Sequence, residues 1–215
     1  MINVLCYGDS NTYGYNPFNG GRYDLDERWT GRLQTLLGKN YRIIEEGLNN
    51  RTTVLDDPLG NHLSGKEYFE VALRTHYPVD LVIIMLGSND LKLRFNMPAV
   101  DIAEGAGKIV EEAIRVSKIK SREDKPCKIL LVAPIHIGKE IEESPYAESF
   151  GGKIAREKSL KFAKYYKQIA EQYGVYFMDA GFYVNPSPED ALHLDSEGHR
   201  ILAYAFRDKI KEIME

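Results

Sequence analysis

Five short, mostly apolar runs divide the chain, and between them apolar residues recur every three or four positions. The runs cover residues 2–6, 41–46, 81–86, 128–133 and 175–178. Runs of this length that are bounded by glycine or polar residues are typical of buried strands. The run at 81–86 is apolar throughout, as expected of a strand that is covered on both faces. The pattern therefore predicts five strands.

Helical spacing appears between these strands. Trp29, Leu33, Leu36 and Leu37 follow the i, i+4, i+7, i+8 pattern of an amphipathic helix, and Gly38 follows as a stop. Further helices are predicted over 65–76, 100–119, 154–173 and 197–214. Loops are predicted over 15–28, 121–126, 134–152 and 190–199. The loop over 134–152 has no periodicity, and a loop of that length in a compact domain is often functional.

Strands that alternate with helices indicate a parallel sheet covered on both faces. We expect an α/β fold, a three-layer, flavodoxin-like sandwich with a five-stranded parallel sheet, in the strand order 2-1-3-4-5 by analogy. The chain shows no repeat, low-complexity segment or linker, so we expect residues 1–215 to form a single domain.

Composition narrows the function classes. The 215 residues are 43% hydrophobic and carry a formal net charge of -4, with Lys and Glu mixed along the chain. Nucleic-acid binding would need a basic face, and a membrane span needs about 18 apolar residues in one run, so we expect neither partner. Cys6 and Cys127 lie in or beside apolar runs, as core residues do. No charged leader precedes the first strand, so a cytoplasmic location is expected.

Four polar clusters follow predicted strands or lie in the last loop. They contain Ser10, Asn50, Asn89, and the segment from Asp190 to His193. Because consecutive parallel strands end on the same edge of a sheet, these side chains can converge there. A serine at that edge becomes a nucleophile only if a base takes its proton and donors stabilise the oxyanion. The four clusters together contain the residue types that an acyl-transfer site needs.

The clusters resemble the sequence blocks of the SGNH (GDSL) hydrolase family. Gly-Asp-Ser at 8–10 matches its first block, Gly-Ser-Asn-Asp at 87–90 its third, and Asp-Ala-Leu-His at 190–193 its fifth. The blocks occur in the family's order and span nearly the whole chain. The sequences of residues 45–53 and 81–90 also resemble those of the arylesterase/acyltransferase branch known from mycobacteria.

The resemblance implies a role for each matched residue. Ser10 would be the nucleophile and its backbone N–H an oxyanion donor, with the Asn89 amide as another. His193 would be the general base, and Asp190 would fix its tautomer. The family's usual oxyanion glycine falls on Asn50 here. A backbone N–H survives any substitution except proline, so we expect Asn50 to contribute its backbone rather than its side chain.

The family further implies hydrolysis of small-molecule esters with short or medium acyl groups, without metal or cofactor, and the branch implies acyl transfer to alcohols. Aromatic residues in the surrounding loops are expected to shape an apolar acyl pocket: Tyr13, Tyr15, Phe18, Phe95, Phe150, Phe182 and Tyr183. The sequence leaves the oligomeric state open. In a homo-oligomer, a partner subunit would narrow the entrance to such a pocket.

Two other functions remain open at this point. One is deacetylation of a carbohydrate on the same fold. The other is a non-catalytic α/β domain that binds a ligand such as a nucleotide, although neither standard phosphate-binding glycine motif follows any strand.

Simpler structural roles are also available to the matched residues. Asn89 could cap a turn, and Asp190 with His193 could be a surface pair. Asp195 with His199 is a rival pair, which the apolar periodicity places on the last helix. The remaining histidines show no paired metal-ligand spacing and are expected in loops or on the surface: His62, His76 and His136.

Overall fold

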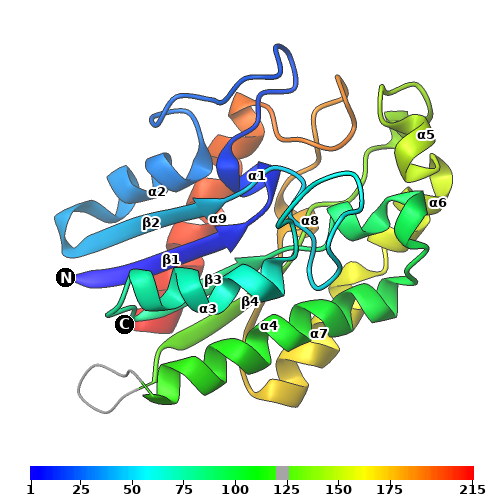
Figure 1. Cartoon of the computed structure of the whole chain (residues 1–215). Helices are drawn as coiled ribbons and strands as arrows, with labels where there is room; N and C mark the ends of the chain where they lie inside the picture. The colour runs from blue at the N-terminus through cyan, green and yellow to red at the C-terminus, as the bar shows by residue number, and fades with distance from the viewer. Residues whose placement is uncertain (120–125) are drawn as a thin grey trace.

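A five-stranded parallel sheet forms the middle of the computed structural model, which describes residues 1–119 and 126–215 (Figure 1). Its order is β2-β1-β3-β4-β5 and every neighbouring pair is parallel, as the sequence predicts. The strands are β1 (Ile2–Gly8), β2 (Tyr41–Gly47), β3 (Leu81–Met85), β4 (Lys128–Ala133) and β5 (Tyr176–Asp179). The loop expected over 121–126 lies, apart from Pro126, outside the described residues.

Helices cover both faces of the sheet and complete the three layers (Figure 1). On β1, Val4 and Cys6 face one layer while Leu5 and Tyr7 face the other, as strand geometry requires. The first layer contains α2 (Trp29–Leu37) and α9 (Ser196–Met214). The second contains α3 (Gly65–Thr75), α4 (Ala99–Ile119) and α7 (Phe162–Tyr173).

Two predictions about secondary structure are wrong in part. The helix expected over 154–173 is two helices, α6 (Lys153–Ser159) and α7. The Ser159 hydroxyl donates to the carbonyl of Arg156 and accepts the N–H of Ile137, and such side-chain bonds to the backbone compete with the helix. The loop expected over 134–152 contains the 3-10 helix Lys139–Glu142 and α5 (Ala147–Phe150).

The remaining helical segments are short and went unpredicted. Each is three or four residues long, too short to show a hydrophobic period. They are α1 (Ser10–Tyr13), α8 (Ala180–Tyr183) and the 3-10 turns Gly38–Asn40, Asn89–Leu91 and Leu93–Phe95.

Both cysteines are buried and unpaired, as expected of core residues. Burial raises the pKa of the Cys6 thiol well above its ordinary value, which keeps it in the unreactive protonated form. Among the described residues, no helix has the length and apolar content that crossing a membrane requires.

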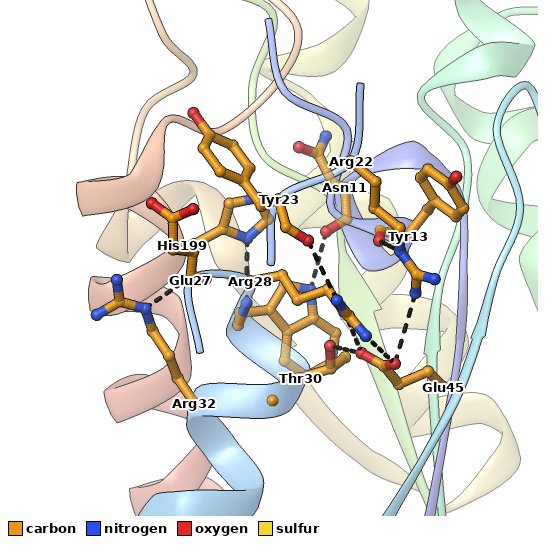
Figure 2. Close-up of polar contacts among 12 residues, drawn as sticks. Asn11, Tyr13, Arg22, Tyr23, Glu27, Arg28, Thr30, Arg32, Glu45 and His199 are labelled. Carbon is orange, nitrogen blue, oxygen red and sulfur yellow. Dashed lines mark hydrogen bonds and ion pairs between the residues drawn. The ribbon is translucent and has the colours of Figure 1, made fainter. Parts of the chain in front are cut away.

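Glu45 on β2 binds side chains of the loop before α2 and of the first turn of α2, and so holds them against the sheet. Arg28 binds its carboxylate with two hydrogen bonds of 2.7 Å each, and the Thr30 hydroxyl donates to the same group. Arg22 adds a longer contact of 3.4 Å. Figure 2 shows these three side chains pointing towards Glu45. Burial raises the pKa of Glu45, but the hydrogen bonds from Arg28 and Thr30 outweigh it and hold the pKa below its ordinary value.

We expect Glu45→Gln to lower the free energy of unfolding by about 2 kcal/mol at neutral pH, because an amide cannot accept both Arg28 bonds. The folded-state pKa is lowered, so the stabilisation is present above the unfolded value near ~4.3 and is lost as the pH falls below it. Denaturant unfolding at pH 7 and at successively lower pH should show the two proteins converging in acid.

Glu212→Gln is the matched control, since Glu212 pairs with Lys209 on the exposed side of α9. Surface pairs contribute about 0–1 kcal/mol. Equal losses in the two variants would contradict the assigned role of Glu45.

Candidate active site

Ser10 lies at the carboxyl edge of the sheet, where β1 turns into α1. Asp9 caps this short helix by accepting the backbone N–H of Asn11 at 3.0 Å. The turn is tight at Gly8, where a β-carbon would lie 2.1 Å from the Thr12 hydroxyl and 2.9 Å from the Met85 carbonyl oxygen. Only glycine fits this position, and its absence of a side chain lets the chain place Ser10 directly after the strand.

Ser10, His193 and Asp190 form one hydrogen-bonded chain. The Ser10 hydroxyl oxygen lies 2.8 Å from His193 Nε2, and His193 Nδ1 lies 2.6 Å from Asp190 Oδ2. A carboxylate only accepts hydrogen bonds, so Nδ1 carries the proton and Nε2 is left to accept from Ser10. All three residues are buried. The structure thus brings together three residues that the sequence blocks single out.

The loop that holds Asp190 and His193 is fixed by its own backbone. Asp190 Oδ1 accepts the N–H groups of Leu192 and His193, both at 2.9 Å. Ala191, which lies between Asp190 and Leu192, has φ +60°, a left-handed conformation that is unfavourable for alanine. The surrounding hydrogen bonds hold it in that conformation. Burial raises the pKa of Asp190, but the bonds from His193 and Leu192 outweigh it and keep the pKa below its ordinary value.

Asn50 and Asn89 border the same cavity as Ser10 and His193. Asn50 has φ +66°, and among the described residues no acceptor binds its backbone N–H. Its side-chain oxygen accepts the Lys92 ammonium at 3.0 Å. Asn89 uses one amide N–H on the carbonyl of Arg51 at 3.1 Å, and the amide has a second N–H. Each residue therefore retains at least one N–H donor that no described acceptor binds.

Asn11 contributes an interaction that the sequence motifs did not reveal. Its side chain donates to the Leu192 carbonyl at 3.2 Å and accepts the Leu194 N–H at 3.0 Å, so it grips both neighbours of His193. Its backbone carbonyl accepts the Trp29 indole at 3.0 Å. Its adjacency to Ser10 was the one available signal, and this cannot show which distant backbone a side chain binds.

His199 does not belong to this site. It is buried on α9, where its Nδ1 accepts the backbone N–H of Trp29 at 3.2 Å (Figure 2). Burial, with smaller effects from nearby cations, lowers the pKa of His199 to about 3. Asp195 caps the same helix through the N–H of Gly198 instead of pairing with His199. The rival pair is thus part of the packing between α2 and α9.

The cavity beside Ser10 has a volume of about 400 Å³. Part of its lining is aromatic: the rings of Tyr15 and Tyr146 lie 4.3 and 5.9 Å from the His193 ring. The predicted aromatic set is correct for Tyr15 and Phe150, and wrong for five residues that do not line this cavity: Tyr13, Phe18, Phe95, Phe182 and Tyr183. Phe18 and Phe182 are largely exposed instead. The sequence could not tell which loop aromatics turn inward.

Lys92 and Arg94 also line the cavity and were not singled out from the sequence. Among the described residues, no group of three or more His, Cys, Asp or Glu side chains is arranged to hold a metal ion.

A buried Ser-His-Asp chain at the carboxyl edge of a parallel sheet is the arrangement that serine hydrolases use for acyl transfer. The model of the GDSL-like lipase/acylhydrolase family matches residues 6–201. The chain belongs to this family, and its resemblance to SGNH (GDSL) hydrolases is confirmed.

Solved structures give the same result. Est24, a carbohydrate acetylesterase from Sinorhizobium meliloti, is 38% identical over 100% of both chains, with a TM-score of 0.92. The native aryl esterase of M. smegmatis is 34% identical over 100% of both chains, with a TM-score of 0.91. A lipase/acylhydrolase from Enterococcus faecalis is 16% identical over 100% of this chain and 98% of its own, and its TM-score of 0.69 shows a shared fold only. The comparison with curated proteins found no match.

We expect Asn50 and Asn89 to respond differently to substitution. Asn50→Gly keeps the backbone N–H and suits the positive φ, so it should retain most of the kcat towards an aryl acetate. Asn89→Ala removes a side-chain donor and should lower kcat by roughly 10²- to 10³-fold, as for other oxyanion donors. Steady-state kinetics measure both. Comparable large losses would mean that the Asn50 side chain is itself required.

Proposed function

We propose that the protein is a serine esterase that hydrolyses small carboxylic esters with short or medium acyl groups through an acyl-enzyme on Ser10. The observation that carries this proposal is the continuous chain from Ser10 through His193 to Asp190, with the ring tautomer fixed by the carboxylate. The family and the esterase names of two similar structures support the same reaction class.

In the first half of the reaction, Ser10 Oγ attacks the ester carbonyl while its proton passes to His193 Nε2. Negative charge develops on the carbonyl oxygen, and the backbone N–H groups of Ser10 and Asn50 and the Asn89 amide stabilise it. The tetrahedral intermediate then collapses and expels the alcohol, which takes the proton from His193. Asp190 stabilises the imidazolium during this step without itself taking a proton.

In the second half, a water molecule attacks the acyl group while His193 takes one of its protons. The second tetrahedral intermediate releases the carboxylic acid, and the proton on His193 returns to Ser10 Oγ. The cavity of about 400 Å³ lies near the lower end of ligand-pocket sizes, which suits small acyl groups.

Carbohydrate O-deacetylation is the second candidate. It is favoured by the polar side chains of the cavity lining, which suit sugar hydroxyls and include Asn49, Asn50 and Ser149. The similarity to Est24 supports it too. A non-catalytic binding domain is the weaker alternative, because it would have no use for the unfavourable φ of Ala191 or the aligned Ser10 hydroxyl.

A panel of aryl and sugar acetates tests the proposal and ranks the two substrate classes. Ser10→Ala and His193→Ala should each lower kcat by roughly 10⁴- to 10⁶-fold. His199→Ala is the matched control, since it removes a buried imidazole outside the site and should reduce stability more than kcat. Unchanged hydrolysis by Ser10→Ala, or a larger kcat loss at position 199 than at 193, would refute the assignment.

Acyl transfer to an alcohol is the finer part of the proposal. An alcohol competes with water when the site orients it and excludes solvent. The hydroxyls of Tyr15 and Tyr146 lie 3.4 Å apart, and both rings stand close to His193, so they shield the base on one side.

With an acetyl ester and a primary alcohol in mostly aqueous buffer, we expect an early ratio of new ester to free acetate above the value set by concentrations and intrinsic reactivities. Tyr15→Ala should lower that ratio by opening the shield, and chromatography of early time points measures it. A ratio equal to the statistical value in the unmodified protein would define a plain hydrolase.

A further inference from the structure

The charged side chains that line the active-site cavity are all cationic. Lys92 and Arg94 belong to the lining, and no Asp or Glu side chain of residues 1–119 or 126–215 does. Composition does not explain this, since the chain has 32 acidic and 28 basic residues. The cavity therefore differs in sign from the protein as a whole, and it combines this charge with the aromatic rings of Tyr15, Tyr146 and Phe150.

Lys92 is buried, between the 3-10 turns Asn89–Leu91 and Leu93–Phe95. Its ammonium donates to the Asn50 side-chain oxygen at 3.0 Å and lies 3.5 Å from Asp57 Oδ2. A buried ammonium needs such partners to stay charged. The interaction places a fixed cation beside Asn50, and thus beside the oxyanion donors proposed above.

Arg94 binds the same carboxylate oxygen. Its Nη2 lies 2.8 Å from Asp57 Oδ2, so one carboxylate serves two cations and the cluster carries one surplus positive charge. Asp57 is almost fully buried behind the two cations. Among the described residues, no acceptor binds Arg94 Nε or Nη1, although a guanidinium has five N–H donors.

A purely structural role does not account for this cluster. Holding the loop at Asp57 needs a single cation, and the second adds repulsion unless an anion offsets it. The neighbouring carboxylate of Asp90 interacts electrostatically with Lys92, but it does not line the cavity and is buried against the N–H and hydroxyl of Thr53. The charge of Arg94 and its unused N–H donors therefore remain available to a bound molecule.

We infer that the preferred ester carries a carboxylate, which Lys92 and Arg94 bind while Ser10 attacks the ester carbonyl. The inference rests on the proposed esterase function. Arginine and lysine bind carboxylates through charge-assisted hydrogen bonds, and the fork of donors on Arg94 matches the two oxygens of that group. Aryl or alkyl esters without a charge would still enter the cavity, but without this contact.

Two matched series test the inference. On the alcohol side, 3-acetoxybenzoate is compared with methyl 3-acetoxybenzoate and (3-acetoxyphenyl)trimethylammonium. On the acyl side, the 4-nitrophenyl monoester of adipic acid is compared with 4-nitrophenyl hexanoate. Each kcat/KM is divided by the rate of hydroxide-catalysed hydrolysis of the same ester, which removes intrinsic reactivity.

We expect the normalised kcat/KM of the anionic ester to exceed that of its neutral partner by about tenfold in at least one series, in line with a charge-assisted contact. The cationic ester should have the lowest normalised kcat/KM. The ratio should fall as salt is added, because ions screen a partly exposed cluster. Arg94→Gln and Lys92→Gln should each lower the anion-to-neutral ratio by several-fold, mainly through KM. Lys139→Gln, on the exposed 3-10 helix, should leave the ratio unchanged.

Normalised ratios near one in both series, or ratios that do not change in Arg94→Gln and Lys92→Gln, would overturn the inference. They would leave the esterase proposal intact, provided that the neutral esters are hydrolysed in a Ser10-dependent manner. Absence of Ser10-dependent hydrolysis of every ester, charged and neutral, would instead refute the proposed function and this inference with it.

Discussion

The grip of Asn11 on the segment around His193 is the interaction on which the candidate site depends. Ser10 and His193 are 183 positions apart, and their side chains must meet within hydrogen-bond distance. Asn11, the residue next to Ser10, binds the carbonyl before His193 and the N–H after it. One short side chain therefore holds the segment of His193 against the turn that carries Ser10.

The position of Asn11 is in turn fixed by the helical layer of α2 and α9. Trp29 begins α2, stacks on Phe206 of α9 at 4.4 Å and donates its indole N–H to Asn11. Its own backbone N–H is accepted by His199, whose ring stays neutral because burial disfavours its charged form. The packing of α2 against α9 thereby reaches Asn11 through the indole hydrogen bond, while the hydrogen bond to His199 stays within that packing. A polar cluster that resembled a rival catalytic pair in the sequence serves this packing.

The sequence predicts the sheet and the ends of its strands well because the apolar runs are buried on both faces and leave few alternatives. It also identifies Ser10, Asn50 and Asn89, which follow predicted strands that end on one edge, and Asp190 and His193 in the last loop, because all of them fall on the sequence blocks of the family. The break at Ser159 was missed, because it depends on a hydroxyl that meets the backbone of a distant loop. Lys92 was missed for a similar reason: nothing local distinguishes a buried lysine with distant partners from a surface one.

The left-handed backbone at Asn50 has a consequence for how relatives of this protein are found. The donor that we assign to this position is a backbone N–H, which every residue except proline has, so the amino-acid sequence does not reveal it. A pattern that demands glycine there would pass over this chain, although the peptide group at φ +66° is of the kind that glycine adopts readily. At this position, the positive sign of φ describes the backbone donor better than the identity of the residue does.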